Sequence, residues 1–403
     1  MTDLEDPREQ MSVHRAIALV NPHAIERNCR RLSRELRDNS QLCAVVKANG
    51  YGHGAMVAAE AAIEGGASWL AVAAPSEVVG DWVDLRAILP DTPILVMGAL
   101  TTGGASPDDL ENALGARCDI TVWRPEFLAH VGELGERALH RPRIHVKYDT
   151  GMGRLGARDP EVVRQMVRDA ATDDRVELVG LWTHFATADE PESDFFNAQL
   201  ARFRDLALPL KEEHPSLLLH AANSAATLRE AGSHFDMVRC GIAIYGLDPF
   251  HEDPAKRDLE PALELRSHVA DVKRFEKGAS AGYGQTWQAP RDTWVGVIPI
   301  GYGDGVRRGL SNNAEVLVGG RRYPLVGTVS MDNITIDLGP ETDVEPGAPA
   351  VLIGSQGQER ILAEEVARRL DTINYEVTTG ISQRVDGAVG SEIPFNEGDA
   401  GAP

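Results

Sequence analysis

Short apolar runs alternate with longer amphipathic stretches from about residue 20 to residue 250. The stretches have the apolar spacing and closing glycines of helices, as in AMVAAEAAIEGG (55–66), and PHAIERNCRRLSRELRD (22–38) precedes the first run. Eight β–α units in about 230 residues predict a TIM-type (β/α)8 barrel over residues 21–250. The alternative is an open doubly wound sheet, but no GxGxxG follows a strand-like run. The eight runs are CAVVKAN (43–49), WLAVA (69–73), PILVMG (93–98), CDITVW (118–123), RIHVKYD (143–149), ELVGLWTHF (177–185), LLLHAAN (217–223) and DMVRCGI (236–242).

The pattern changes after residue 250 to alternation with a period of two, interrupted by turn pairs such as GG and PG. This pattern predicts a mostly β C-terminal domain over residues 251–390, with one helix at LAEEVARRLD (362–371). The segment MSVHRAIALV (11–20) also alternates, and we expect it to pair with the β domain. The tail, residues 391–403, is predicted to be disordered.

Composition and charge exclude several classes of protein. Hydrophobic residues make up 43% and charged residues 25%, which is typical of a globular chain, and the apolar runs are too short to span a membrane. A net charge of −21 repels phosphate backbones, so we expect no nucleic-acid partner. The acidic start MTDLEDPREQ fits neither a secretory signal nor a transit peptide, which indicates the cytoplasm. Four widely spaced cysteines predict free thiols and no metal site.

Candidate chemistry collects where the predicted barrel strands end, the edge at which barrel enzymes place their functional groups. Lys47 follows Ala44-Val45-Val46, and burial among apolar groups lowers the pKa of an amine, as a nucleophilic lysine requires. The structural alternative for each such residue is an ion-paired or snorkelling side chain. The side chains at these strand ends are Lys47, Lys147, Asp149, His184, Asn223, Ser224 and Arg239.

The run AVVKANGYGHG (44–54) closely resembles the pyridoxal-phosphate lysine motif of alanine racemases. The resemblance continues nearly end to end in the family's order, so that the set of motifs is far more specific than any one of them. The other matching segments are HVKYDTGMGRLG (145–156), GLWTHFATADE (180–190), HAANSAATL (220–228), FDMVRCGIAIYGLDP (235–249), AGYGQTW (281–287), IGYGDGVRRGLSN (300–312), VGTVSMDNITIDL (326–338) and INYEV (373–377). The family fold is a pyridoxal-phosphate barrel followed by a β domain, as the pattern alone predicts.

The resemblance implies a catalytic pair on opposite sides of pyridoxal 5'-phosphate. Lys47 would bind the cofactor covalently and then act as one acid/base group, and Tyr283 of the partner subunit would be the other. Racemisation removes a proton from one face of Cα and returns one to the other, so two groups on opposite faces suffice. A surface turn is the alternative for Tyr283. The expected assembly is a homodimer with shared active sites.

Further roles come with the same resemblance. Arg239 would hydrogen-bond the pyridine nitrogen, His184 would orient Arg239 and link it to Tyr283, and Arg154 would hold the substrate carboxylate. Lys147 resembles a lysine that is often carbamylated; Asp149 could instead supply its negative partner. The phosphate ligands would be Tyr51, Ser224, the amides of Gly241 and Ile242, and Tyr375, although Ser224 could be a helix cap and Tyr375 a packed aromatic. Met331 and Asp332 would border the substrate, Tyr302 would narrow the entrance, and Asn223 would support the site.

The expected activity is the interconversion of L-alanine and D-alanine, supplying D-alanine for cell-wall peptidoglycan. A broader racemase for serine or lysine is the nearest alternative, because the sequence does not reveal the width of the pocket. A non-catalytic pyridoxal-phosphate carrier resembles the barrel alone and needs no second acid/base group such as Tyr283. A decarboxylase of similar two-domain design is disfavoured, because the motifs around Tyr283 and Met331 resemble those of racemases.

Overall fold

The computed structural model describes residues 14–80, 83–100 and 107–390 of the 403-residue chain. Residues 11–13 of the expected first strand and the tail expected to be disordered, 391–403, lie outside the described residues. The chain forms two compact units. Of the described residues, one unit comprises those from Ile25 to Phe250 with Asp258–Glu260; the other comprises those up to Ala24, His251–Arg257 and those from Pro261 on.

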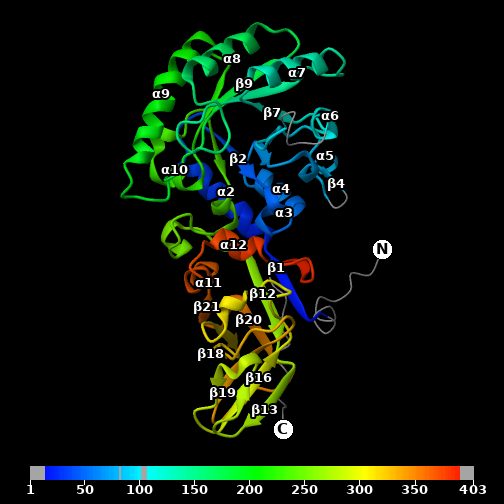
Figure 1. Cartoon of the computed structure of the whole chain (residues 1–403), viewed down its shortest axis with the longest axis vertical. Coiled ribbons are helices and arrows are strands. Elements are labelled where there is room, and N and C mark those ends of the chain that lie inside the picture. The colour runs from blue at the N-terminus through cyan, green and yellow to red at the C-terminus, as the bar shows by residue number, and fades with distance from the viewer. Residues whose placement is uncertain (1–13, 81–82, 101–106, 391–403) are drawn as a thin grey trace. The chain divides into compact units, whose positions relative to one another are not determined.

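Eight parallel strands close into a barrel in the first unit, in the order β10-β11-β2-β3-β6-β7-β8-β9 (Figure 1). This arrangement confirms the predicted (β/α)8 fold. Strand residues are buried nearly throughout, which explains why the sequence shows continuous apolar runs there instead of alternation. The strands are β2 (Gln41–Val45), β3 (Trp69–Val72), β6 (Ile94–Val96), β7 (Asp119–Val122), β8 (Arg143–Lys147), β9 (Glu177–Trp182), β10 (Leu218–His220) and β11 (Met237–Cys240).

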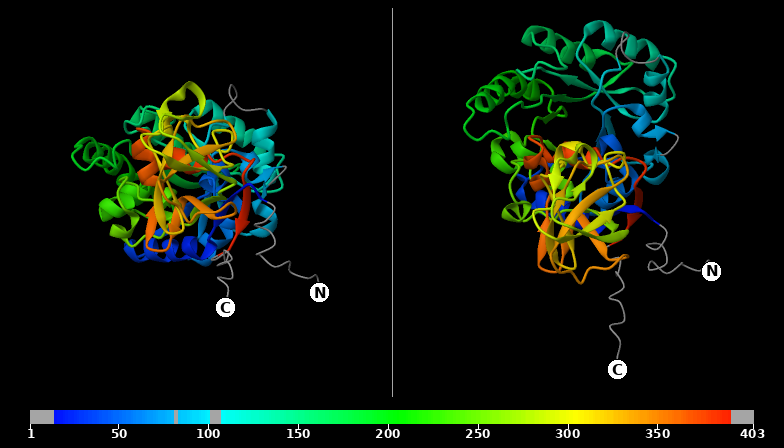
Figure 2. Two further views of the ribbon diagram at one scale, coloured as in Figure 1. Left: turned by 90° about the horizontal axis from the view of Figure 1, so that it is seen from below. Right: turned by 60° about the horizontal axis from the view of Figure 1, so that its bottom comes forward.

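Helices connect these strands, and α7, α8 and α9 lie outside the strands that they follow (Figures 1 and 2). Asp159 caps α8 by accepting a hydrogen bond from the Glu161 amide, and Pro160 takes the first helical position. The helix predicted over 22–38 ends earlier, at Glu35, and Asn39 then turns the chain with φ 70°. The connecting elements are α2 (Pro22–Glu35), α3 (Lys47–Tyr51), α4 (Ala55–Glu64), β4 (Val79–Gly80), β5 (Val83–Asp84), α5 (Leu85–Ile88), α6 (Pro107–Gly115), α7 (Pro125–Gly135), α8 (Pro160–Thr172), α9 (Phe195–Glu213) and α10 (Ser224–Arg229).

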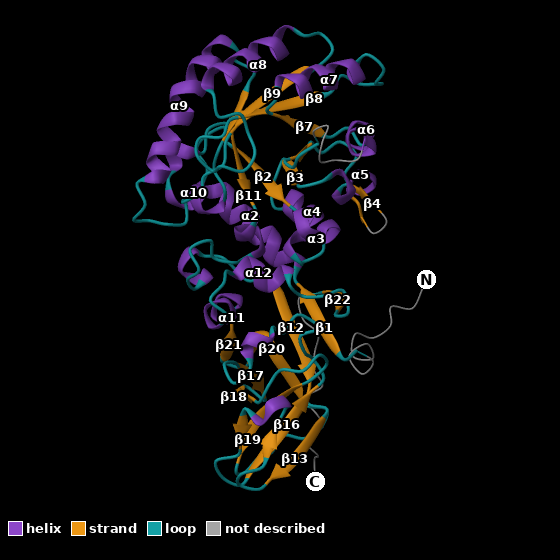
Figure 3. Ribbon diagram, viewed as in Figure 1, coloured by secondary structure: helices purple, strands orange, loops and turns teal. Residues whose placement is uncertain are grey.

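The second unit is mostly β, as predicted (Figure 3). Its main sheet has the order β13-β16-β19-β18-β17-β20-β12-β1-β22, with β21 paired to β20. Helix α11 (Ala363–Arg369) lies within the segment predicted to be helical, and α12 (Asn374–Thr379) follows it. The strands are β1 (Ala16–Val20), β12 (Leu263–His268), β13 (Asp271–Phe275), β14 (Ser280–Ala281), β15 (Trp287–Gln288), β16 (Thr293–Ile298), β17 (Glu315–Val318), β18 (Arg321–Val326), β19 (Ile334–Gly339), β20 (Pro349–Gln356), β21 (Glu359–Ile361) and β22 (Asp386–Val389).

The early strand β1 pairs antiparallel with β12 and parallel with β22. All five of its residues are buried, although the sequence alternates around it. A strand that is covered on both faces needs no polar face, which explains why the sequence of β1, AIALV, is entirely apolar. Within the described residues, no helix is both long and apolar enough to cross a bilayer.

Candidate functional site

Lys47 opens an unusual turn directly after strand β2. The next four residues, Ala48, Asn49, Gly50 and Tyr51, all have φ between 52° and 60°, in the left-handed region. Each non-glycine residue there costs roughly 1–2 kcal/mol, so other contacts must hold the turn. The Ala48 amide donates to the Glu77 carboxylate at 2.8 Å, and the Asn49 side chain accepts from the Ala55 amide at 3.0 Å. The turn brings the Lys47 amine to 6.0 Å from the centre of the Tyr51 ring.

The environment of Lys47 favours a neutral amine. Burial lowers the pKa of Lys47 below its ordinary value, the positive charge of Arg154 lowers it further, and Glu77 partly opposes both. A lowered pKa leaves more of the amine unprotonated and nucleophilic at neutral pH.

Arg239 is fixed in the barrel interior and is 3% exposed. Its guanidinium donates to Nδ1 of His220 at 3.0 Å, to the Thr183 carbonyl at 2.8 Å and to the Ala221 carbonyl at 3.1 Å. The expected partner His184 lies farther away, with its Nδ1 3.4 Å from Arg239. Burial lowers the pKa of Arg239 to about 10, so the side chain remains a cation at neutral pH.

Lys147 is 4% exposed, and its amine lies 3.9 Å from the centre of the Trp182 ring. Burial, with the charges of Arg239 and Arg154, lowers the pKa of Lys147 to about 7. Asp149, considered as its partner, instead accepts the amides of Gly151 and Gly153 at 3.0–3.1 Å. Among the described residues, no carboxylate forms an ion pair with Lys147.

Hydroxyl groups and backbone amides meet where β11 ends. Ser224 Oγ accepts the Gly241 amide at 3.0 Å and the Ala243 amide at 3.3 Å. Ile242 begins a 3-10 turn (Ile242–Tyr245), so its amide has no acceptor within that turn. A Cβ on Gly241 would lie 2.3 Å from the Tyr51 hydroxyl, so only glycine allows this approach.

The helix cap beside this cluster is Asn223, not Ser224. The Asn223 side chain accepts the Ala226 amide at 3.0 Å at the start of α10. The Ser224 hydroxyl instead accepts the Gly241 and Ala243 amides and so belongs to the cluster with Tyr51 and Ile242. Hydroxyls and amides at a turn suit a phosphate dianion, and the nearby amine of Lys47 suits an aldehyde, so these residues fit pyridoxal phosphate.

Arg154 is exposed in the first unit, between β8 and α8. The other five predicted site residues belong to the second unit, as do their contacts. Tyr283 is 73% exposed between Gly282 and Gly284, whose φ angles are 74° and 72°. Its carbonyl accepts the Thr328 hydroxyl at 2.8 Å, which fixes the backbone and leaves the phenol outside the core. Tyr302 and Met331 are also exposed, at 42% and 50%.

Backbone and ionic contacts link these exposed residues within the second unit. The Tyr302 amide donates to the Ser330 carbonyl at 2.9 Å, and Asp332 accepts Arg384 at 2.6 Å. Tyr375 lies in α12, and its ring centre is 6.4 Å from that of His251.

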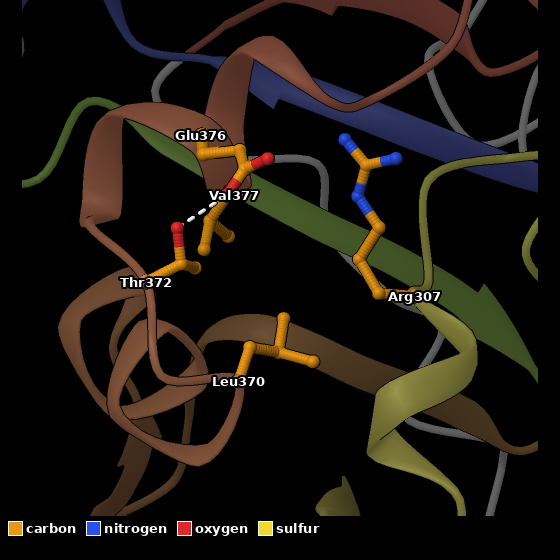
Figure 4. Close-up of a pocket in the computed structure, with 5 residues that line it drawn as sticks. All are labelled: Arg307, Leu370, Thr372, Glu376 and Val377. Atoms are coloured by element: carbon orange, nitrogen blue, oxygen red, sulfur yellow. Dashed lines mark hydrogen bonds between the residues drawn. The ribbon is translucent and has the colours of Figure 1, made fainter.

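A hollow of about 200 Å³ lies beside α12 (Figure 4). Thr372 donates a hydrogen bond to Glu376 on one side of it, and Arg307 comes from a different segment. None of the residues predicted from the sequence lines the hollow, which is formed by Arg307, Leu370, Thr372, Glu376 and Val377.

Three residues at the barrel site were not identified from the sequence. His220 makes the shorter of the two histidine contacts to Arg239, and Trp182 lies under both Lys147 and Arg239. Both occur in segments that resemble the family, so closer attention to HAANS and GLWTH could have found them. Glu77 occurs in no motif, and only the fold brings it to Lys47.

In the described part of the chain, no group of three or more His, Cys, Asp or Glu side chains is arranged to hold a metal ion.

Both parts of the chain match models of one protein family. Residues 20–249 match "Alanine racemase, N-terminal domain", and residues 262–389 match "Alanine racemase, C-terminal domain". The alanine racemase of Symbiobacterium thermophilum is 41% identical over 377 residues, covering 93% of this chain and 97% of the relative.

Solved structures give the same result. Alanine racemase from Streptomyces coelicolor A3(2) matches with a TM-score of 0.86 and 36% identity, covering 94% of this chain and 99% of the other. Alanine racemase from Bartonella henselae with covalently bound pyridoxal phosphate matches with a TM-score of 0.80 and 26% identity, covering 93% and 99%. The chain therefore belongs to the alanine racemase family.

Proposed function

We propose that the protein interconverts L-alanine and D-alanine with pyridoxal 5'-phosphate as cofactor. The observation that carries the proposal is the amine of Lys47, whose pKa is lowered, beside the ring of Tyr51, whose hydroxyl in turn meets the hydroxyl and amide cluster of Ser224 and Gly241. Family membership and the cofactor named for the Bartonella henselae relative support the same reading.

The barrel residues would hold the cofactor by three different contacts. Lys47 would bind it covalently, and Arg239, a cation held in place by His220 and Thr183, would donate to the pyridine nitrogen. Bound pyridoxal phosphate withdraws electrons from the α-carbon of an attached amino acid and so makes its proton removable. The proposed phosphate ligands of the barrel are Tyr51, Ser224 and the amides of Gly241 and Ile242, and the resemblance to the family adds Tyr375 of the second unit.

Two proton-transfer groups then account for racemisation. Lys47 removes or returns a proton on one face of the substrate α-carbon, and Tyr283 does so on the opposite face. We place Tyr283 in the site of the partner subunit, because its exposed phenol and fixed backbone suit a group supplied to another chain. The protein is therefore proposed to be a homodimer.

The substrate contacts follow from charge and position. Arg154 is exposed and donates to the alanine carboxylate, a task suited to its fork of N–H groups, and the Met331 amide is the second donor. Tyr302 narrows the entrance, Asp332 borders the substrate, His184 steadies Arg239 and Asn223 supports Ser224. Lys147, with its pKa near 7, is partly neutral, which is the form that carbon dioxide carbamylates; the carbamate would supply an anion for Arg154.

The proposal is tested with purified protein, pyridoxal phosphate and L-alanine, followed by optical rotation or a D-amino-acid oxidase assay. We expect D-alanine to form up to equal amounts of both enantiomers, and the Lys47→Ala protein to form none. Serine and lysine in the same assay test the broader alternative. No D-alanine from protein that has bound the cofactor would favour the carrier.

The cellular role is proposed separately. We place the enzyme in the cytoplasm, where its product would supply D-alanine for cell-wall peptidoglycan. Expression in a bacterial strain that requires D-alanine tests this role. Growth without added D-alanine supports it, and no growth despite active enzyme in the extract contradicts it.

A further inference from the structure

A continuous chain of hydrogen bonds crosses the barrel interior from β7 to β11. Asp119 Oδ2 lies 2.9 Å from His145 Nε2, His145 Nδ1 lies 2.9 Å from His220 Nε2, and His220 Nδ1 lies 3.0 Å from Arg239. These four side chains are at most 3% exposed. At the outer end, Arg143 donates to the other oxygen of Asp119 at 2.9 Å.

Gly180 makes the central contact of this chain possible. It lies on β9, between the strands of the two histidines, and pairs with His145 in the sheet. A Cβ at Gly180 would lie 2.3 Å from His145 Nδ1 and 3.1 Å from His220 Nε2, where the two rings meet. The His220 ring also stacks on Trp182 at 5.7 Å and 8°, which fixes its plane.

The positions of the protons follow from the contacts. A guanidinium only donates, so Nδ1 of His220 must accept from Arg239 and the proton of His220 lies on Nε2. That proton is donated to Nδ1 of His145, whose own proton therefore lies on Nε2 and is donated to Asp119. Both imidazoles are neutral, and every donor in the chain points from the cation towards the anion.

The charges at the two ends explain what this series of hydrogen bonds does. Arg239 is a buried cation, and among the described residues no carboxylate lies within ion-pair distance of it. A buried charge is costly unless it is compensated, and hydrogen bonds in series polarise one another. Burial raises the pKa of Asp119, but the hydrogen bond from His145 at 2.9 Å and the ion pair with Arg143 at 2.9 Å hold the pKa below its ordinary value. Asp119 therefore supplies the negative charge at this end.

We propose that Asp119 and His145 are positioning residues that act through His220 to keep Arg239 charged and aimed at the pyridine nitrogen of the cofactor. The last step rests on the proposed function, whereas the hydrogen-bond chain does not. Asp119 lies at the beginning of β7, whereas Arg239 lies near the end of β11. The negative charge of Asp119 would thus act on the opposite, functional end of the barrel strands. No other route among the described contacts joins a carboxylate to Arg239 through hydrogen-bonded side chains.

The first experiment measures the protons directly. Nitrogen-15 NMR of the holoenzyme with labelled histidine rings should show neutral His145 and His220 at neutral pH, each with its proton on Nε2. Spectra of His145→Gln and His220→Gln proteins assign the two signals. A proton on Nδ1 of His220, or a doubly protonated ring at either position, would overturn the proposal.

The second experiment compares pyridoxal phosphate with its 1-deaza analogue, which has carbon in place of the pyridine nitrogen. Asp119→Asn keeps the shape and removes the charge, and Gly180→Ala separates the two rings. The measured quantity is the ratio of the two dissociation constants, which gives the preference for pyridoxal phosphate over the analogue. Each variant should reduce this preference by roughly three- to tenfold, the range that one hydrogen bond contributes. A merely structural defect weakens both ligands equally.

Thr121→Val is the matched control, because Thr121 is equally buried on β7 but donates to the Val96 carbonyl at 2.7 Å. It should leave the ratio unchanged.

Suppose that the wild-type protein is an active racemase but the ratio is unchanged in Asp119→Asn and Gly180→Ala. This result overturns the positioning role and leaves the proposed function standing. If wild-type protein binds no cofactor, the proposed function and the last step of this inference both fail, and the same NMR measurement on the protein without cofactor still decides whether the chain of hydrogen bonds exists.

Discussion

The carboxylate of Glu77 accepts the backbone amide of Ala48, the residue directly after Lys47, at 2.8 Å. The same carboxylate accepts the Ala73 amide at 2.7 Å. Glu77 therefore joins the end of β3 to the left-handed turn that carries the lysine, and its charge raises the pKa of Lys47 against the lowering by burial and Arg154.

We expect Glu77→Gln to lower the pKa of Lys47 further, because the variant removes the one anion that favours the charged amine. The rate of covalent reaction with pyridoxal phosphate, measured against pH in protein without cofactor, reports this pKa, and its profile should move to lower pH. Glu126→Gln, in the first turn of α7, is the control and should leave the profile in place. A shift to higher pH would contradict the electrostatic role of Glu77.

Lys47→Ala should abolish the covalent adduct with pyridoxal phosphate that borohydride reduces. The structure puts this amine at the end of the first barrel strand, beside the hydroxyl and amide cluster that suits a phosphate. Mass spectrometry after reduction measures the adduct. The control Lys273→Ala removes an exposed lysine paired with Asp271 and should keep full labelling. A reduced adduct on another lysine of the Lys47→Ala protein would refute the assignment.

Mixing two inactive proteins tests whether two chains share each site. Lys47→Ala and Tyr283→Phe proteins are unfolded and refolded together in equal amounts. About half of the dimers are then mixed, and one of the two sites in each carries both wild-type residues, so activity should return to roughly a quarter of wild type. If both residues served one site within one chain, mixing would restore nothing, and native mass spectrometry would show that mixed dimers had nevertheless formed.

Lys147→Met should stabilise the protein at low pH. The pKa of Lys147 falls from 10.5 to about 7 on folding, so between these values the unfolded chain binds more protons and this lysine's contribution to stability rises with pH. Below pH 7 Lys147 is charged in both states, and the full free-energy cost of burying that charge is present. We expect the variant to gain on the order of 1–4 kcal/mol at pH 6 and to lose that advantage towards pH 10.

Urea unfolding in carbon-dioxide-free buffer, without cofactor, measures this difference. Lys273→Met is the control, because its ion pair is exposed, and its free energy of unfolding should stay within about 0.5 kcal/mol of wild type at each pH. A gain for Lys147→Met that does not change between pH 6 and pH 10 would show that packing, and not charge, is responsible.

The sequence by itself determined the barrel, the mostly β second part and the family. Strands buried on both faces must be continuous apolar runs, and eight of them with helical spacers leave few other folds. Lys47 and Arg239 could be found because a charged residue at the end of an apolar run is conspicuous. The sequence also showed Lys147, His145 and Asp149 at alternate positions, and the structure buries all three.

Only the tertiary structure decided which of these side chains meet. Asp119 and His220 are 101 positions apart, counted from their numbers, and their link through His145 depends on the missing side chain of Gly180 on a strand between them. Asp149 accepts the amides of its own loop, and Glu77, from the 3-10 turn after β3, accepts the amide of Ala48 beside Lys47. Periodicity records which face a residue occupies, but hydrogen-bond partners across a closed barrel depend on register and on the room that neighbouring side chains leave.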